Sequence, residues 1–446
     1  MTLSIKNTNS NYLAKVVRLQ NVRPHPNADR LQLATVDFNT IIVGKDAQEG
    51  QVYIYFPLES ALNPKFLSDT NSYSDPVRNV NPEVKGFFNK QGRVRAVKLR
   101  GTPSEGYVVP LQTFNVWASV AIEGYSNITE EQVGTEFDTI EDFLICEKYI
   151  PQHIRERGLS NKPKGKQEKR FNRIIDGQFH FHVDTAHLKK NIHRVNPDDT
   201  ITISYKLHGT SMVASRVLVK RKLKLREKLA KLLKIRVQDS EYGLVYSSRK
   251  VIKNEFERKE TGTGDWYKED VWGSAAKSIQ EKLEDGVSIY AEIVGYTPSG
   301  SSIQKGYDYG CKPGQFKVYV YRMTYTNQSG RVFEFSTNQI KNYCERHGLE
   351  MVPILFHGQA RQYVDYCEDE HIGPDESLRA WREELLDEFI NDYLEQPCHM
   401  CNNNVPAEGV VVTVEREEFQ AFKLKSFSFL ERETKELDNG EIGLEA

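Results

Sequence analysis

The sequence lacks several features that would each mark a class of protein. Six cysteines in a chain of 446 residues are too few for a disulfide framework. No apolar run approaches the roughly 18 residues that a membrane-spanning helix needs, which excludes a transmembrane protein. The first residues, MTLSIKNTNSNYLAK, have neither the basic start nor the apolar core of a secretory signal. We therefore expect a cytoplasmic protein, with the nucleus as the alternative location.

A large net charge is also missing, yet the charges are strongly segregated along the chain. The formal net charge is −2, but residues 155–173 hold eight basic and two acidic side chains. Residues 216–236 hold ten basic and one acidic side chain, whereas 365–388 hold ten acidic and two basic. A basic stretch of this kind can bind a polyanion locally, or it can be a solvated linker or helix face. Both interpretations stay open for 216–236.

Length and composition indicate a soluble protein of two or three domains. At about 150 residues per domain, 446 residues suit that number. A content of 39% hydrophobic and 27% charged residues is typical of a globular chain. The stretch RERGLSNKPKGKQEKR has few apolar residues and predicts a linker. We place an N-terminal domain at 1–150, a basic linker at 151–175 and a C-terminal domain at 176–446.

Short strands separated by turn clusters fill the N-terminal domain, which is typical of a small sandwich or barrel. The run VVRLQNVRPHPNADRLQLATV resembles the OB-type tRNA-binding domains of some aminoacyl-tRNA synthetases, and this implies an OB-like nucleic-acid-binding barrel. The peptide from His25 to Asp29 is interpreted by itself as a tight turn, with hydrogen bonds from Asn27 and Asp29. The predicted strands are 14–22, 30–38, 40–44, 51–56, 92–101 and 106–110.

Strands and helices alternate irregularly in the C-terminal domain, so that the chain as a whole is expected to be α+β. The segment FHFHVD, with His180 and His182, predicts a strand before this domain's core, and neither histidine is expected to be a metal ligand. An acidic helix is predicted from Asp375, and another between Ser336 and Gly348. Further strands are predicted at 200–205, 211–219, 243–247, 287–293, 316–323, 409–414 and 420–425. A basic helix near 220–236 would carry an apolar stripe made of Leu225, Leu229, Leu232 and Leu233.

One lysine stands out among the four that begin the pattern Lys-x-x-Gly. The pattern begins at Lys98, Lys162, Lys206 and Lys259, and alone it has little weight. Lys206 directly follows a predicted strand, as a nucleophile beside a phosphate-admitting turn would. It is also the only one followed, in order, by Ser248-Arg249, Glu292-Ile293-Val294-Gly295, Tyr321, Glu408-Gly409-Val410-Val411 and Lys423-Leu424-Lys425.

These residue types suit the transfer of a nucleotide to a lysine. A protonated amine cannot attack phosphorus, so neighbouring cations are needed to favour the neutral amine. The same cations stabilise the charge that builds up on the α-phosphate during attack. The side chains with the required chemistry are Arg249, Lys423 and Lys425 for positive charge, Glu408 for a magnesium ion, Glu292 for ribose hydroxyls and Tyr321 for the purine face.

The ordered set resembles the motifs of the covalent nucleotidyltransferase superfamily of ligases and mRNA capping enzymes. The peptide KLHGTS, which begins at Lys206, is similar to RNA ligases of the ligase-2-like group, whereas DNA ligases and capping enzymes usually have KxDG. The segment 301–323 resembles that group's stretch from the third motif into the strand with the adenine-stacking aromatic. An OB domain before the ligase domain resembles the Deinococcus- and Naegleria-type RNA ligases. The motif match spans about 176–430.

The resemblance implies an ATP-dependent RNA ligase with an N-terminal OB-like barrel and a C-terminal adenylyltransferase domain, acting in RNA repair with Mg²⁺ or Mn²⁺. The implied partner is RNA, as a nicked or broken duplex or at an RNA–DNA junction, and we expect a monomer. Carried over by position, Lys206 would form lysyl-AMP and His208 would assist strand joining. Arg249 and Glu292 would hold the ribose and phosphate, Tyr321 would stack on adenine, Glu408 would act with the metal, and Lys423 and Lys425 would contact phosphates.

Two alternative functions remain beside this interpretation, and two further features of the sequence bear on it. A capping-type guanylyltransferase would use the same chemistry with GTP, and a non-catalytic RNA-binding adaptor would keep only the fold. The stretches 217–241 and 325–405 are longer than the resemblance leads us to expect, which bears on substrate preference. A zinc site is also conceivable, although its two ligand pairs lie 50 residues apart and buried free cysteines are common; it would use Cys344, His347, Cys398 and Cys401.

Overall fold

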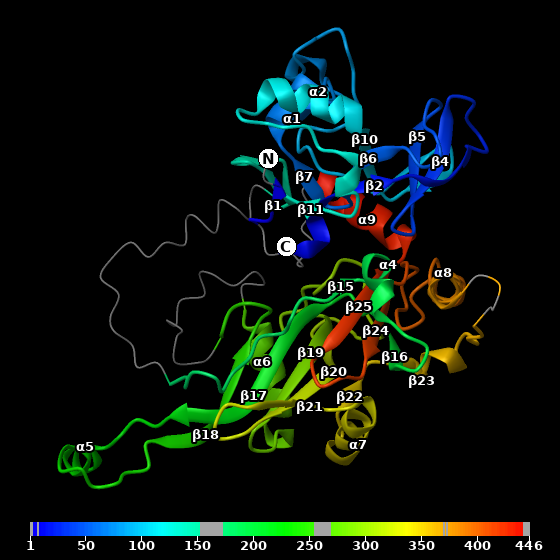
Figure 1. Ribbon diagram of the computed structural model, residues 1–446. Helices are drawn as coiled ribbons and strands as arrows, with labels where there is room; N and C mark the ends of the chain where they lie inside the picture. Colours follow the sequence, from blue (N-terminus) through cyan, green and yellow to red (C-terminus); the bar gives the residue numbers. More distant parts are fainter. Residues whose placement is uncertain are drawn as a thin grey trace.

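The computed structural model describes residues 3–6, 9–151, 173–253, 269–368, 371 and 373–439, which fold into an N-terminal and a C-terminal part (Figure 1). The predicted linker at 151–175 lies almost wholly outside these residues, and so does most of the basic stretch at 155–173. None of the described helices has both the length and the hydropathy that crossing a bilayer requires.

Strands dominate the N-terminal part. Its main sheet has the order β10-β6-β2-β11, and β3, β4 and β5 form a second sheet. The strands are rich in β-branched and aromatic residues, which suit a pleated, half-buried surface. The elements are β1 (Leu3–Ser4), β2 (Ala14–Arg18), β3 (Gln20–Pro24), β4 (Leu31–Val36), β5 (Asn39–Gly44), β6 (Val52–Pro57), β7 (Ser60–Leu62), α1 (Pro64–Asp69), β8 (Val97–Leu99), β9 (Thr102–Ser104), β10 (Gly106–Pro110), α2 (Leu111–Ala121), β11 (Glu136–Phe137), β12 (Thr139–Ile140), β13 (Phe143–Leu144) and β14 (Cys146–Lys148).

The peptide from His25 to Asp29 forms a turn, as predicted, but its contacts reach further than its own backbone. The side-chain amide of Asn27 donates to the carbonyl of Arg100 at 3.0 Å, and buried His25 lies 3.1 Å from the carbonyl of Leu99. The turn is therefore held against the β8–β9 hairpin. The predicted strand at 92–101 is confined to β8.

Two antiparallel sheets form the C-terminal part. One has the order β15-β25-β24-β16-β23, in which only β15 runs parallel to its neighbour. The other has the order β18-β17-β19-β20-β21, with β22 also paired to β20. The strands are β15 (Ala186–His187), β16 (Thr200–Tyr205), β17 (Thr210–Lys220), β18 (Ser240–Ser247), β19 (Val287–Gly295), β20 (Phe316–Thr326), β21 (Val332–Glu334), β22 (Glu350–Met351), β23 (Ile354–Gln359), β24 (Gly409–Val414) and β25 (Gln420–Lys425).

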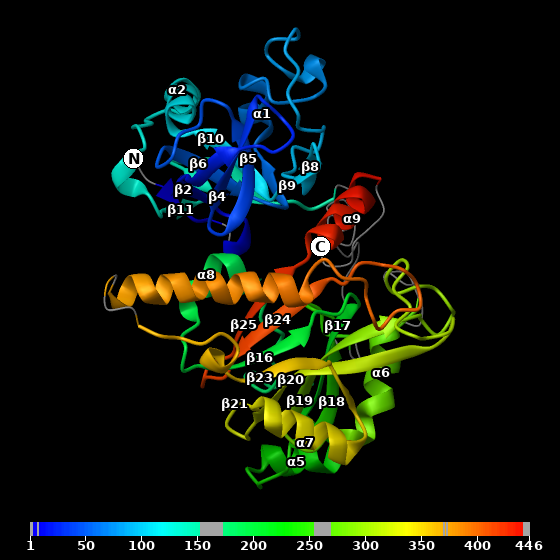
Figure 2. The ribbon, with the colours of Figure 1, turned by 90° about the vertical axis from the view of Figure 1, so that its right-hand side faces the viewer.

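Helices cover both sheets. Those of the C-terminal part are α4 (Leu188–Asn191), α5 (Leu225–Leu232), α6 (Val271–Ile279), α7 (Thr337–His347), α8 (Pro374–Tyr393) and α9 (Phe427–Asp438). The expected helix between Ser336 and Gly348 is α7, with a capping box at Ser336 and a left-handed Gly348 at its end. The acidic helix is α8, which buries Trp381, Leu385 and Phe389 and runs between the two parts of the molecule (Figure 2).

Two local predictions differ from the structure. The segment 179–184 forms no strand, because its backbone is not paired to any of the described strands; its side chains still alternate, with His182 packed against aromatic rings and Phe181 exposed. The basic helix is only α5, which lies at the far end of the long β17–β18 hairpin (Figure 1). Its apolar stripe does not pack on a core, since Leu225 and Leu232 are each 80% exposed.

Candidate active site

Three neighbouring strands bring residues of the candidate site to one edge of a sheet. Lys206 directly follows β16, and its backbone N–H donates to the carbonyl of Gly409 at 2.9 Å. Glu408 directly precedes β24, and Lys425 ends β25 opposite Gly409 in the antiparallel register. Residues far apart in sequence therefore share one edge of the sheet.

Gly409 is required by this arrangement. Its φ of 137° is a value that side-chain-bearing residues rarely adopt. A Cβ atom at this position would lie 2.0 Å from the carbonyl oxygen of Leu424 on the adjacent strand. The glycine of the predicted Glu-Gly-Val-Val motif therefore allows β24 and β25 to approach closely and places Glu408 beside the lysines.

Glu408 is a fully buried carboxylate surrounded by nitrogen atoms. Its Oε1 atom lies 2.6 Å from Lys206 Nζ and 3.6 Å from Lys425 Nζ, while Oε2 lies 3.8 Å from His208 Nδ1. A buried carboxylate is costly unless cations neutralise it. The side chains of Lys206 and Lys425 are each 12% exposed, so this ion cluster is largely shielded from water.

The turn after Lys206 is fixed to the second sheet through Gly209. Its backbone N–H donates to Glu292 Oε1 at 3.1 Å, and its carbonyl accepts from Gln304 Nε2 at 2.7 Å. A Cβ atom on Gly209 would lie 2.3 Å from the carbonyl oxygen of Ile293. Glu292 therefore supports the lysine loop directly, in addition to any contact with a ligand.

His208 rests on aromatic residues that the sequence did not single out. Its backbone N–H donates to the hydroxyl of Tyr309 at 2.6 Å. Tyr309 is buried and has a left-handed backbone with φ of 48°, a strained conformation that is concentrated at functional sites. Tyr307 and Phe429 each present an edge to the imidazole at 4.9 Å between ring centroids. The only signal for the two tyrosines was their place within the segment 301–323.

A β-bulge places Tyr321 at the other end of the site. Tyr290 pairs with Arg322 and Ala291 with Val320, which leaves Tyr321 as the extra residue of β20. Its hydroxyl lies 3.0 Å from Ser211 Oγ, and burial raises its pKa, so the phenol stays protonated.

His182 packs edge-on against Tyr321, with 5.1 Å between ring centroids. Burial, together with the positive charges of Arg322 and Arg249, lowers the pKa of His182 to about 3. The imidazole is therefore neutral at physiological pH. The sequence predicts a strand at this histidine and carries no sign that it borders the site.

Arg249, Lys423 and Lys425 line one pocket, into which Asp184 also projects. Arg249 pairs with Asp184 at 2.8 Å. Burial acts to raise the pKa of Asp184, but the adjacent Arg249 outweighs it and the net pKa lies below the usual value. Tyr12, Lys148 and Tyr149 of the N-terminal part line the same pocket, together with Glu59 and Glu433, so this charged region lies between the two parts.

The four residues considered for zinc do not converge. Cys344 lies on the buried face of α7, whereas His347 Nε2 lies 3.0 Å from Glu284. Cys398 and Cys401 pack instead beside the cluster that contains Tyr309. Within the described ranges, no group of three or more histidine, cysteine or acidic side chains has an arrangement that suits a metal ion.

Comparisons with known proteins agree with this geometry. A family model described as RNA ligase matches residues 199–427, and one described as an OB-fold domain matches 13–111. A search of curated proteins found no match. Among solved structures, a lysine-to-alanine mutant of Naegleria gruberi RNA ligase with ATP and Mn has a TM-score of 0.56 and 17% identity, covering 94% of this chain and 98% of that one. Another lysine-to-alanine mutant with ATP and Mn has a TM-score of 0.54 and 15% identity, covering 97% and 99%. The expected order of an OB fold and a ligase domain is confirmed.

Proposed function

Because the chain belongs to the RNA ligase family, we propose that it is an ATP-dependent enzyme that joins a 3′-hydroxyl end of RNA to a 5′-phosphate end. The observation that carries this proposal is the pairing of Lys206 Nζ with buried Glu408 at 2.6 Å, beside Lys425 and the histidine of the same loop. A lysine with cations and a carboxylate around it suits nucleophilic attack on a phosphate.

In the first step Lys206 would attack the α-phosphorus of ATP. A bond forms between Nζ and phosphorus, the bond from the α-phosphorus to the bridging oxygen breaks, and pyrophosphate leaves while the amine loses a proton. Glu408 stabilises the protonated amine at rest, whereas the positive charges of Lys423, Lys425 and Arg249 favour the neutral form and stabilise the phosphates.

The nucleotide would be held by the residues on either side of this cluster. ATP is the proposed donor because the similar Naegleria structures contain ATP or AMP. We assign Tyr321 to stack on adenine, since its phenol is fixed by Ser211. Glu292 and Arg249 are assigned to the ribose and phosphate. Glu292 lies beside the lysine loop, and Arg249 lines the same pocket as Lys423 and Lys425.

Glu408 offers one carboxylate to a metal ion, which would take its remaining ligands from water and substrate. Mg²⁺ usually keeps several waters and binds through one or two carboxylates plus substrate phosphates. Glu408 supplies a carboxylate of this kind next to the proposed phosphate position. A bound Mg²⁺ or Mn²⁺ would neutralise charge on the phosphates, and Glu408 is the residue assigned to hold it.

The remaining steps would transfer AMP from Lys206 to the 5′-phosphate of RNA, after which the 3′-hydroxyl displaces AMP and seals the strand. His208 is assigned to assist this last step, since the Tyr309 hydroxyl and two aromatic edges hold it in place. The N-terminal OB fold and the basic hairpin around α5 are assigned to hold the nicked or broken duplex. We place the enzyme in RNA repair, acting as a monomer.

The first test is incubation with α-labelled ATP and Mg²⁺ or Mn²⁺, followed by denaturing electrophoresis. Label should survive denaturation in the parent and vanish in Lys206→Ala. The matched control is Lys98→Ala, because Lys98 begins the same Lys-x-x-Gly pattern but pairs with Glu431 outside the site. Preferential labelling with GTP would select the guanylyltransferase alternative. Absence of label with both nucleotides, from protein stripped of bound nucleotide, would select the RNA-binding adaptor.

A further inference from the structure

Lys425 is shared between two carboxylates, and the second one comes from the last helix. Its Nζ atom lies 3.6 Å from Glu408 Oε1, and 3.3 Å and 3.2 Å from the two carboxylate oxygens of Glu433. The side chains of Lys425 and Glu433 are 12% and 15% exposed. Charges shielded from water to this degree interact more strongly than an exposed surface pair.

The start of α9 fixes the helix face that looks onto the site. Ser426 follows Lys425 directly and caps α9, accepting from the Phe429 N–H at 3.3 Å and donating to the Ala407 carbonyl at 2.7 Å. Glu433 follows Phe429 by four residues, so the two side chains share one helix face. Phe429 makes a T-shaped contact with His208, which places this face against the candidate site.

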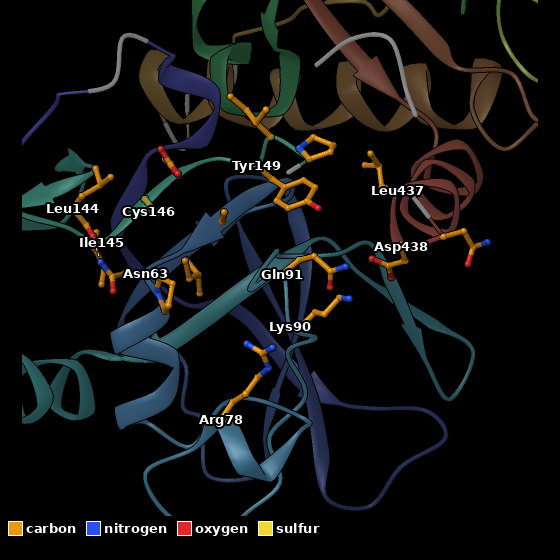
Figure 3. A pocket seen from close by; sticks show the side chains of 17 residues that line it. Asn63, Arg78, Lys90, Gln91, Leu144, Ile145, Cys146, Tyr149, Leu437 and Asp438 are labelled. Atoms are coloured by element: carbon orange, nitrogen blue, oxygen red, sulfur yellow. Dashed lines mark hydrogen bonds between the residues drawn. The ribbon is translucent and has the colours of Figure 1, made fainter. Parts of the chain in front are cut away.

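The rest of α9 is tied to the N-terminal part. Phe427 belongs to the apolar core of that part. At the other end of the helix, Asp438 accepts from buried Arg93 at 3.0 Å and from Arg95 at 3.2 Å. Figure 3 shows Asp438 in the wall of a pocket that Lys90 of the N-terminal part also lines. A continuous chain of contacts therefore runs from Arg93 along α9 to Lys425.

We propose that Glu433 is a positioning residue for lysine adenylylation, which acts through Lys425 and is itself placed by the docking of α9 on the N-terminal part. The inference rests on the proposed function and deepens it. Glu433 draws Lys425 away from Glu408, the carboxylate that Lys206 also contacts. Lys425 thereby stays beside Lys206 without displacing Lys206 from Glu408. The N-terminal part thus influences the first chemical step through a helix, in addition to any contact with RNA.

The sharpest test is Glu433→Gln, which keeps the size and a hydrogen-bond acceptor but removes the charge. Lys425 should then move onto Glu408, and Lys206 should lose part of its counter-charge. We expect single-turnover formation of lysyl-AMP at saturating ATP to slow by about tenfold. Glu433→Asp should restore part of the rate.

The matched control is Glu431→Gln on the same helix. Glu431 pairs with Lys435 at 3.1 Å and Lys98 at 3.6 Å, outside the active site. This variant should keep the parent's rate. Asp438→Asn should slow adenylylation in the same direction as Glu433→Gln but by less, since it only loosens the docking of α9.

A double-mutant cycle separates positioning from general stability. In a Lys425→Ala background, Glu433→Gln should cause no additional loss of rate. The assignment is overturned if Glu433→Gln adenylylates at the parent's rate, or if it changes only the unfolding temperature. A parent that forms no lysyl-AMP would instead overturn the proposed function, and the role of Glu433 with it.

Discussion

The backbone N–H of His208 donates to the hydroxyl of Tyr309 at 2.6 Å, and this bond joins the loop after Lys206 to a strained, buried tyrosine. A residue with a left-handed backbone persists only where the surrounding structure holds it. Here the neighbouring Asp308 does so, since its carboxylate accepts from the backbone N–H groups of Gly310, Asn402 and Asn403. The segments 307–311 and 398–403 therefore form a platform beneath His208.

Removing this hydroxyl should impair strand joining. Tyr309→Phe keeps the ring but leaves the His208 N–H without its acceptor, which should lower stability by about 1 kcal/mol. Sealing of pre-adenylylated nicked RNA should slow severalfold, as measured in single-turnover assays. The control is Tyr307→Phe, which loses a bond to the Pro406 carbonyl at 2.8 Å but keeps its edge contact with His208. Equal sealing rates in both variants would contradict a role for the Tyr309 bond.

Acid should destabilise the protein partly through His182. Its pKa in the folded state is about 3, because of burial and then the charges of Arg322 and Arg249, whereas an unfolded histidine has a pKa of about 6.5. Below pH 6.5 the unfolded state binds a proton that the folded state does not. The free energy of unfolding should therefore fall as the pH drops from 6.5 towards 3, by at most about 1.4 kcal/mol per pH unit from this residue.

Urea unfolding at a series of pH values checks this prediction. His182→Phe should show a shallower decline below pH 6.5 than the parent. His180→Phe is the control, because His180 lies two residues away and its ring bonds only to the Gly177 carbonyl among the contacts described. Parallel curves for the parent and His182→Phe would assign the acid sensitivity to other groups.

The basic hairpin should contribute to RNA binding and not to adenylylation. Replacing 221–236 by a short Gly-Ser linker keeps the pairing of β17 with β18 up to Lys220 and Ser240. We expect weaker binding of nicked duplex RNA and a smaller dependence of the affinity on salt, since phosphate contacts are lost. Lysyl-AMP formation should be unchanged. A variant with Leu225→Ser and Leu229→Ser keeps the charges and should bind RNA like the parent; equal losses of binding and adenylylation would defeat the assignment.

Buried Arg93 should be a major source of stability between the two parts. Its side chain is 1% exposed and pairs with Glu59 at 2.8 Å and Asp438 at 3.0 Å. Arg93→Met removes a buried cation from Glu59 and leaves Asp438 with Arg95 as its remaining arginine, which should cost about 3 kcal/mol in chemical unfolding. Arg95→Met removes a more exposed partner of Asp438 and should cost about 1 kcal/mol or less. Similar losses of unfolding free energy in the two variants would show that the burial of Arg93 does not strengthen its ion pairs.

The sequence alone determined the residue types of the candidate active site and much of the chain's secondary structure. Every predicted strand from 200 onward is present, because each is a short run rich in β-branched, aromatic or other apolar residues, which favours a strand with buried side chains. The capping pair Ser336 and Gly348 likewise encodes the ends of α7 locally. The ordered set from Lys206 to Lys425 could be recognised because its chemistry constrains residue types at each position.

Only the tertiary structure decided which of these residues meet and what supports them. The register of β16, β24 and β25 places Lys206, Glu408 and Lys425 together, and register depends on pairing between distant segments. Tyr309, His182 and Glu433 carry no local signal, since their roles arise from packing across the chain. The leucines of α5 are a case in which the local pattern was correct but the packing was not. Their spacing predicts an amphipathic helix, yet among the described residues the helix has no core to pack against and its leucines are exposed.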